Sequence, residues 1–575
     1  MNLFNLSALK LAGVKAGNII AGDHKLYVKF LRHLSRRVKR DVITKNMIFL
    51  TALSAYTDNP INLFLRGESS IGKSYNVTQT LKYFPRQDVW LLGGLSPTAL
   101  IHMHGVLVDE NGEPIIEVPK PGKDASAEQR EAYEAYKAKL KNACSLIDLQ
   151  CKILVFLEAP HVETFNMLRP ILSHDTWELS YKFTDKTGKG SLRTQHVILR
   201  GWPATIFCSS NEKYIQDLAT RSFTITPEMS EQKYRVANVV SGVREANPWA
   251  SEQDFDYFLL QSYISFLKEN SKVKVVNPYA PVFAEAFPAK SPRSMRDFPH
   301  VLSLMKVYAF FHLYQRPAVK IKIKRNGEEH VEQCILVTAK DYDFILALWG
   351  NIHEQTETSA TANILRFYHN VAVPLTEEKG EWSAADAVEK WNGMFEDKKS
   401  DRTIRSWLNF LQSVGYVTSW PDPERRSRNL YKAIKKPANF GNFEISHIFK
   451  AEILKNWFNE LKQFWQKQTL PSLDGDDVEF EIFENMTSNV TLTVDQLYQK
   501  YYRDGIGHFC QNYLRQNQPS LPEKGQEIRR NEFLPKSAGE RQCERCSSRA
   551  FTVIVREDGE HWLCGKCLQE WEGNL

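Results

Sequence analysis

The sequence lacks long hydrophobic runs. Its 575 residues contain no stretch of about 18 uncharged apolar residues, the length that a membrane-spanning helix requires. The N-terminal segment MNLFNLSALKLAGVKAG has no basic stretch followed by a long apolar core, so it does not resemble a secretory signal. We therefore expect a cytoplasmic protein that does not associate with membranes.

The chain also has little excess charge of either sign. Lys and Arg number 74 against 68 Asp and Glu, which gives a formal net charge of +6. Nucleic-acid binding is therefore permitted but not required, and any basic surface must be local. Hydrophobic residues make up 42% and charged residues 25%, an ordinary mix for a folded protein. The length exceeds what one hydrophobic core supports, so we expect several domains.

Cysteine is scarce outside one C-terminal cluster. Of nine cysteines, five are scattered and are expected to be ordinary thiols in a reducing compartment, namely Cys144, Cys151, Cys208, Cys334 and Cys510.

The other four form two C-x-x-C pairs separated by seventeen residues, Cys543, Cys546, Cys564 and Cys567. Paired thiolates on two turns complete a tetrahedral Zn²⁺ site with no open position, which predicts a structural zinc ribbon. The segment between the pairs indicates a hairpin around Asp558-Gly559. The alternative, a pair of disulfides, is disfavoured in a reducing compartment.

The segment LFLRGESSIGKSYNV matches a phosphate-binding loop, or P-loop. It follows an apolar strand and precedes a helix, so backbone N–H groups at a helix N-terminus would face the phosphates. Lys73 would reach the β- and γ-phosphates, and Ser74 would hold Mg²⁺. We expect ATP to contact Gly67, Glu68, Ser69, Ser70, Ile71, Gly72, Lys73, Ser74 and Tyr75. The alternative, a plain glycine-rich turn, does not need the Lys-Ser pair.

Short apolar runs alternate with helical segments between residues 60 and 225: INLFL, VWLLGG, KILVFL, ATIFCSS and SFTIT. This alternation predicts an α/β domain with a largely parallel sheet. The run KILVFL is followed directly by Glu158, which is placed to orient the attacking water of a nucleotide hydrolase. Leu157 occupies the position where such strands usually carry a metal-ordering Asp. The alternative is that Glu158 is an ordinary surface residue at a strand end.

Further segments resemble, in the right order, the ATPase core of the AAA+ class, in the pre-sensor-1-hairpin branch that contains the minichromosome-maintenance (MCM) helicases. SPTALIHMHGVLVDENGEPI resembles the helix-2 insertion of that branch, and EAPHVETFNMLRPILSHD its next helix. ELSYKFTDKTGKGSLRTQHVILRGWPATIFCSSN resembles the pre-sensor hairpin and the sensor-1 strand. The resemblance covers residues 60–310.

The resemblance implies roles for three residues. Asn211 falls at the sensor-1 position, which helps to place the lytic water. Arg221 lies in a segment similar to the arginine-finger segment, so it would act on a neighbouring subunit's nucleotide. Arg296 lies at the sensor-2 position, with Arg293 as a nearby alternative. Both arginines could instead be ordinary surface residues. Leu157, together with the lack of an oligonucleotide-fold domain before the ATPase core, indicates a divergent relative from a phage or mobile element.

The sequence patterns and the resemblance together divide the chain into consecutive parts: an N-terminal helical segment (1–58), an AAA+ core (59–229) with an insertion (109–142), a helical lid (230–370), a winged helix (371–438), an unassigned helical region (439–535) and the zinc ribbon (536–575). The fold class is therefore an α/β P-loop core with helical, winged-helix and zinc-ribbon additions. In the lid, VKIKIKRNGEEHVEQCILV predicts a hairpin that turns at Asn326-Gly327.

Two basic segments are candidates for contact with DNA. The tip of the pre-sensor hairpin carries Lys186 and Lys189, with Arg193 on one arm, and such cations hold phosphates without reading bases. The alternative is a solvated basic turn. In the winged helix, residues 397–436 contain ten Lys and Arg against four Asp and Glu, so the local excess equals the net charge of the whole chain. The candidate contacts there are Arg402, Arg405, Arg425 and Arg426, although winged helices also bind proteins.

These features predict an ATP-driven DNA helicase or translocase that acts in the replication of a phage or mobile element. It would use ATP, Mg²⁺ and Zn²⁺. It would form a ring-shaped, hexameric homo-oligomer on single-stranded or forked DNA and would bind other replication proteins. The alternative is an ATP-dependent DNA-binding switch, such as a loader or initiation factor, which the missing Asp favours. A P-loop kinase for a small molecule would not need a winged helix or a zinc ribbon.

Overall fold

The computed structural model describes the following residues: 23–93, 105–109, 112–122, 126–141, 143–158, 162–185, 193–209, 221–248, 255–289, 292–325, 328–425, 428–434, 446–468, 478–503, 552–556 and 559–563. Among them, no helix is both long enough and apolar enough to cross a membrane.

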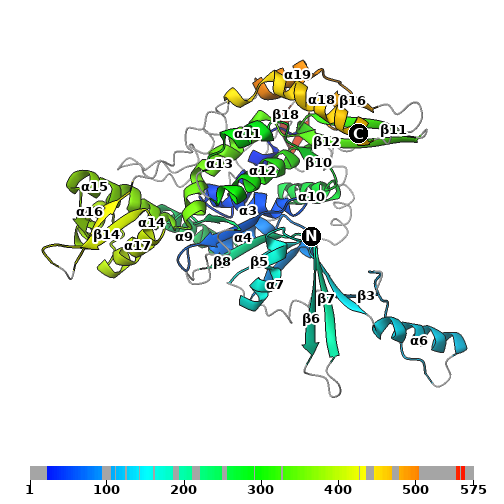
Figure 1. The fold of residues 1–575 in the computed structure, drawn as a ribbon, viewed down its shortest axis with the longest axis horizontal. Coiled ribbons are helices and arrows are strands. Elements are labelled where there is room, and N and C mark those ends of the chain that lie inside the picture. The colour runs from blue at the N-terminus through cyan, green and yellow to red at the C-terminus, as the bar shows by residue number, and fades with distance from the viewer. Residues whose placement is uncertain are drawn as a thin grey trace. The chain divides into compact units, whose positions relative to one another are not determined.

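A five-stranded parallel sheet forms the centre of the N-terminal half (Figure 1). Its strands are β1 (Asn62–Arg66), β2 (Val89–Leu92), β5 (Ile153–Phe156), β8 (Ala204–Ser209) and β9 (Phe223–Ile225). They lie in the order β2-β5-β8-β1-β9, and all neighbours are parallel. Each of the five apolar runs became one of these strands, so the prediction of a parallel α/β sheet is confirmed. β1, β5, β8 and β9 are buried along their whole length, as parallel strands covered on both faces require.

Three helices near the N-terminus pack with this sheet: α2 (Leu26–Leu34), α3 (Val42–Ser54) and α4 (Lys73–Leu81). α2 is amphipathic. α3 is buried on nearly every side between β8, β1, α4 and the lid helix α12 (Ser294–Phe311). The η1 turn (Arg86–Asp88) leads into β2, and α7 (Val162–Leu172) follows β5.

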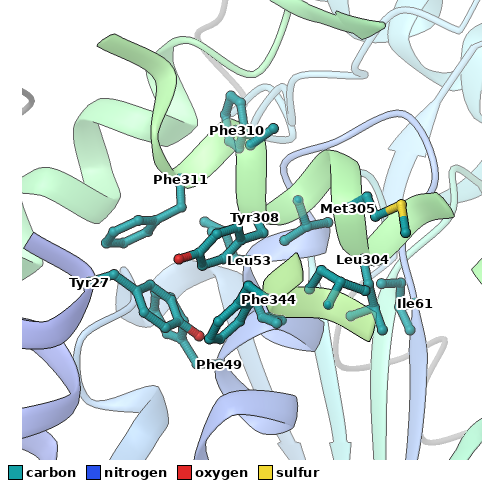
Figure 2. Packing of buried hydrophobic residues seen from close by; sticks show 14 of the residues in the cluster. Tyr27, Phe49, Leu53, Ile61, Leu304, Met305, Tyr308, Phe310, Phe311 and Phe344 are labelled. Carbon is teal, nitrogen blue, oxygen red and sulfur yellow. The ribbon is translucent and has the colours of Figure 1, made fainter. Parts of the chain in front are cut away.

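An aromatic cluster joins the N-terminal helices to the lid (Figure 2). Tyr27 meets Tyr308 edge-on with ring centroids 5.1 Å apart, and Tyr308 stacks on Phe344 at 4.2 Å. Phe49 and Phe311 lie edge-on at 5.5 Å in the same cluster. Such pairs add about 0.5–1.5 kcal/mol each beyond their buried area. The N-terminal helices, the sheet and the lid therefore share one hydrophobic core.

A second sheet combines the insertion with the predicted hairpin. It contains β3 (Val106–Val108), β4 (Cys144–Asp148), β6 (Glu178–Asp185) and β7 (Arg193–Arg200), in the order β3-β4-β7-β6. β6 and β7 are antiparallel, so the hairpin arms form as predicted. The sequence did not reveal that β4 would pair in parallel with β7. The inserted helix α6 (Ala127–Lys141) is largely exposed, as expected.

The lid region is mixed rather than purely helical. The predicted hairpin is present as two antiparallel strands, and its Asn326-Gly327 turn lies outside the described residues. The elements are α9 (Glu231–Ala246), α10 (Phe255–Glu269), β10 (Lys274–Val276), α11 (Ala280–Ala286), α12, η2 (Leu313–Gln315), β11 (Ala318–Arg325), β12 (Glu328–Leu336) and α13 (Ala339–Thr358).

The region from residue 439 onward, which the sequence left unassigned, adds further elements to the lid region. It contains η5 (Ser446–Ile448), α18 (Ala451–Gln468), β16 (Val478–Phe483), α19 (Val494–Tyr498) and the π-helix η6 (Gln499–Arg503). β16 pairs antiparallel with β11, so residues 439–503 contribute an edge strand to the lid sheet, whose order is β10-β12-β11-β16.

The predicted winged helix has its own hydrophobic core, which extends from Ala360 to Ala433. Its elements are α14 (Ala362–Phe367), the π-helix η3 (Tyr368–Ala372), α15 (Val373–Lys379), β13 (Trp382–Ser383), α16 (Ala384–Met394), α17 (Asp401–Ser413), β14 (Val417–Pro421) and β15 (Asn429–Ala433). The core therefore begins before residue 371, because apolar side chains of α14 and η3 pack into it. Ser400 caps α17 by accepting a hydrogen bond from the Thr403 backbone.

Near the C-terminus, β17 (Thr552–Arg556) and β18 (Gly559–Leu563) pair antiparallel. They form the arms of the hairpin predicted around Asp558-Gly559. The four clustered cysteines, Cys543, Cys546, Cys564 and Cys567, lie outside the described residues. The zinc ribbon therefore stays a prediction.

A buried ion pair fixes the start of α13. The Arg316 guanidinium donates to both carboxylate oxygens of Asp341, at 2.6 to 3.0 Å. Asp341 also accepts hydrogen bonds from the backbone and side chain of Thr338, which completes a capping box. Burial disfavours the charged guanidinium, but the Asp341 carboxylate outweighs this effect and raises the pKa of Arg316. The pair is therefore satisfied on both sides.

We expect Asp341→Asn to lower the free energy of unfolding by about 3–5 kcal/mol, because it leaves the Arg316 charge buried without its partner. Urea unfolding followed by circular dichroism measures this loss. The matched control is Glu332→Gln, which removes the largely exposed pair with Lys274 and should cost less than about 1 kcal/mol. Equal losses in the two variants would contradict a special role for the buried pair.

Candidate functional site

One edge of the parallel sheet brings the predicted nucleotide-binding residues together. The carboxyl ends of parallel strands meet at the same edge, which is the usual position for ligands in open α/β sheets. There β1 leads into the P-loop, β5 leads to Leu157 and Glu158, and β8 lies between them. A cavity of 580 Å³ at this edge is lined by Ser69, Ser70, Gly72, Lys73, Ser74, Tyr75, Leu157, Glu158, Cys208 and Ser209. Two segments that lie far apart in the sequence thus form one site.

The P-loop backbone curls as the glycine spacing predicted. Gly67, Ser70 and Gly72 all have positive φ, at 137°, 66° and 89°. A Cβ atom on Gly67 would lie 2.5 Å from Cδ1 of Ile71 and 3.0 Å from Cγ2 of Thr226, so a larger residue would displace the Ile71 side chain and would be strained at this positive φ. Gly72 immediately precedes α4, whose N-terminus favours negative charge. The loop is therefore a concave backbone cradle of the kind that binds phosphate groups.

Lys73 and Ser74 lie at the start of α4 and line the cavity. The Lys73 ammonium donates to the carbonyl oxygens of Gly67 and Glu68 at 2.8 and 2.6 Å. Burial lowers the pKa of Lys73, and the nearby Glu68 carboxylate partly offsets this effect. Burial also raises the pKa of the Cys208 thiol to about 12, so the thiol is neutral beside them. The positive charge in this part of the cavity therefore comes from Lys73.

The donor set of the cavity fits Mg²⁺ bound together with phosphate. Glu158 is exposed and is the only carboxylate among the cavity-lining residues, while the Ser74 hydroxyl lies on the P-loop side. Mg²⁺ commonly keeps several waters and takes few protein ligands plus phosphate oxygens. Leu157, at the position where such strands usually carry an Asp, also lines the cavity and offers no metal ligand.

A buried polar network contacts the P-loop on the side away from the cavity. The sequence did not predict this network. The Lys233 ammonium lies 2.5 Å from an Asp41 carboxylate oxygen and donates to the Ile71 carbonyl oxygen at 2.9 Å. Asp41 also accepts from the Asn76 side chain at 2.7 Å and from the Glu228 backbone at 2.7 Å. The network links the P-loop, α4, the start of α3 and the segment after β9. No local motif marks it, because Asp41 and Lys233 lie far apart in the sequence.

Arg221 lies at the opposite edge of the sheet. Its carbonyl oxygen accepts a hydrogen bond from the side chain of Asn62, the first residue of β1, whereas the P-loop follows the last residue of β1. At about 3.3 Å per residue, roughly 16 Å separate the two ends. The Arg221 guanidinium donates to the Ser173 hydroxyl at 2.5 Å. Arg221 therefore does not contact the cavity of its own chain.

The start of α12 lies beside Arg221. The Arg293 guanidinium donates to the Ser222 carbonyl oxygen at 3.1 Å and pairs with Asp297, whereas Arg296 is exposed. The two sensor-2 candidates thus differ, because Arg293 is held in a structural ion pair. Burial lowers the pKa of His300 to about 3. This histidine is therefore neutral near pH 7 and adds no charge to the arginines at this edge.

The remaining predicted residues fall into two groups. Asn211, Lys186, Lys189 and Arg426 lie outside the described residues, as does the side chain of Arg193 at the start of β7. The other group lies on the winged helix: Arg402 and Arg405 are exposed on the first turn and a half of α17, and Arg425 is exposed in the wing. Arg405 pairs with Asp401 at 2.6 Å, an exposed contact that a phosphate could replace.

We expect Lys233→Met to weaken nucleotide binding about tenfold or more, because the Ile71 carbonyl loses the donor that fixes the P-loop. It should also destabilise the fold by about 3–5 kcal/mol, since Asp41 is left buried without its counter-charge. Titration with a fluorescent ATP analogue and urea unfolding measure the two effects.

The double variant Lys233→Met/Asp41→Asn should regain stability without regaining nucleotide affinity. The control is Lys272→Met, an exposed lysine that should change neither quantity. Full affinity in Lys233→Met would show that the network does not position the P-loop.

Comparison with solved structures gives a weak likeness. No family model matches the chain, and no curated protein matches it. Among solved structures, the Orc1 protein of Aeropyrum pernix, determined in complex with DNA, is similar at 11% sequence identity, over 71% of this chain and 92% of that chain, with a TM-score of 0.19. A TM-score this low does not establish a shared fold. The functional conclusions therefore depend on the geometry of the site.

Proposed function

We propose that this chain is an ATPase of the AAA+ type that couples ATP binding and hydrolysis to work on DNA. The observation that carries the proposal is the cavity in which the P-loop and Glu158 meet at one edge of a parallel sheet. A phosphate cradle alone would support nucleotide binding. The carboxylate on a separate strand adds a group that can activate water, which supports hydrolysis.

The residues of the cavity divide the chemical work. The backbone N–H groups of the P-loop bind the phosphates, and Lys73 neutralises their negative charge. Ser74 would hold Mg²⁺, which would supply charge stabilisation at the phosphates when bound. Glu158 orients the attacking water and accepts its proton. Asn211, which follows the β8 segment, is proposed to help place that water.

Arg221 and Arg296 are proposed to act on the nucleotide of a neighbouring copy. Both belong to the segments at the edge opposite the cavity, so neither serves the site of its own chain. An arginine finger stabilises charge on the transferred phosphoryl group and contributes several orders of magnitude to the rate. Hydrolysis would then require a homo-oligomer, for which we propose a hexameric ring.

DNA contacts are proposed at two places. Lys186, Lys189 and Arg193 on the pre-sensor hairpin would hold a single strand through its phosphates. On the winged helix, Arg402, Arg405, Arg425 and Arg426 would meet duplex or forked DNA. The proposed work is unwinding or translocation during replication of a phage or mobile element, together with other replication proteins. The zinc ribbon at Cys543, Cys546, Cys564 and Cys567 would be structural.

The leucine at position 157 favours a second candidate function. Leu157 lines the cavity where motors of this class carry an Asp, so Glu158 is the only carboxylate among the described residues that line the cavity. Weaker metal positioning would slow turnover. A slow ATPase suits a DNA-binding switch, such as a loader or initiation factor, better than a processive motor.

Unwinding of a forked DNA duplex with Mg²⁺ and ATP distinguishes the two. We expect strand displacement by the native chain and none by Lys73→Ala, which loses the phosphate contact. Lys186→Ala should remove displacement while leaving ATP binding intact, because Lys186 is proposed to hold DNA and is not among the residues proposed to bind the nucleotide. Stable DNA binding with no displacement by the native chain, even at high protein concentration, would establish the switch instead.

A further inference from the structure

The winged helix joins the rest of the chain through a short linker. The main hydrophobic core and the winged-helix core are separate clusters of side chains. α13 ends at Thr358 and α14 begins at Ala362, and between them Ser359 has a φ of 58°, in the left-handed region. A non-glycine residue in this region is uncommon and is held there by its surroundings.

Arg66 holds this linker. It is the last residue of β1, directly before Gly67 of the P-loop, and it is only 4% exposed. Its guanidinium donates to the Ser359 carbonyl oxygen and lies 5.6 Å from the ring centre of Phe410 on α17. One buried cation thus contacts the linker and the helix that carries Arg402 and Arg405.

Thr226 makes a second connection between the P-loop and the winged helix. Its methyl group packs against the first glycine of the P-loop, where an added Cβ would approach it to 3.0 Å. Its hydroxyl oxygen accepts from the Ala362 backbone at 3.4 Å, and its backbone donates to Gln355 at 2.8 Å. The start of the P-loop therefore contacts residues that fix both ends of the linker.

A third contact lies away from the P-loop. His369 of the π-helix η3 is 2.9 Å from the Glu354 carboxylate of α13, at a more exposed position. Hydrogen bonding to Glu354 raises the pKa of His369. This pair helps to seat the winged helix without touching the nucleotide site, so it serves as a natural control.

We propose that Arg66 couples nucleotide occupancy of the P-loop to the seating of the winged helix, by which we mean its position against α13 and the P-loop. Through this position, nucleotide would change the DNA affinity of α17. The inference rests on the proposed function and adds its regulation. A loop that tightens on phosphates displaces Gly67 and, with it, the adjacent Arg66. A displacement of about 1 Å is enough to break a hydrogen bond of normal length. Because Arg66 contacts both the Ser359 carbonyl and the Phe410 ring, its displacement either moves the linker with it or breaks this contact. Packed interfaces turn such small shifts into discrete rearrangements.

The test measures the affinity of the full chain for a fluorescent DNA duplex, by anisotropy, with and without a non-hydrolysable ATP analogue and Mg²⁺. In the native chain the two dissociation constants should differ by at least about fivefold, the lower end of measured couplings between sites. Arg66→Ala should bring their ratio to within twofold of one. Arg66→Lys should restore the ratio only partly, because lysine lacks the planar group that covers Phe410.

Glu354→Gln is the matched control. It weakens seating in both nucleotide states, so both dissociation constants should change together while their ratio is kept. Titration with the fluorescent ATP analogue checks that Arg66→Ala still binds nucleotide. If that variant fails to fold, Phe410→Leu replaces it, since this change removes the ring and keeps the hydrophobic packing.

Three outcomes would overturn the inference. Arg66→Ala and Phe410→Leu that keep the native ratio would show that the coupling runs elsewhere. A native chain that binds nucleotide and DNA independently of each other would refute the coupling but leave the proposed function intact. A native chain that binds neither nucleotide nor DNA would contradict the proposed function itself and the coupling with it.

Discussion

The direction of the strands in the central sheet is the constraint on which the site depends. Five parallel strands present all their carboxyl ends at one edge, so the P-loop after β1 and Glu158 after β5 line one cavity. The same direction places the segment before β9, with Arg221, at the other edge. The cavity and Arg221, the proposed arginine finger, therefore lie at opposite edges of one sheet. Neighbouring copies in the proposed oligomer would bring the two together.

Buried polar contacts connect the cavity to more distant parts of the chain. Lys233 and Asp41 join the P-loop to α3 and to the segment after β9. Arg66 and Thr226 join its first residues to the linker of the winged helix. Buried polar groups of this kind are costly when they lose a partner, so they permit few arrangements. The P-loop is thus joined by buried contacts to the linker that precedes α14, the path along which the proposed coupling would run.

The sequence predicted those features that local patterns encode. The five strands followed from apolar runs, the P-loop from glycine spacing, and the hairpin of β11 and β12 from its alternating pattern and Asn-Gly turn. Contacts between distant segments were not predictable in this way. The pairing of β4 with β7 and of β16 with β11 depends on tertiary packing, as does the Lys233–Asp41 pair. The early start of the winged-helix core was missed because α14 resembles the preceding lid helices in its apolar pattern.

We propose above all that each nucleotide site takes its general base, Glu158, from one copy and its arginine finger, Arg221, from the next. ATP hydrolysis by mixtures of Arg221→Ala and Glu158→Gln chains tests it most directly. Each variant alone should be inactive, since one lacks the finger and the other lacks the base. In mixed oligomers the intact cavity of an Arg221→Ala chain can receive the finger of a Glu158→Gln chain, so hydrolysis should reappear. A mixture no more active than its two components would contradict the shared site.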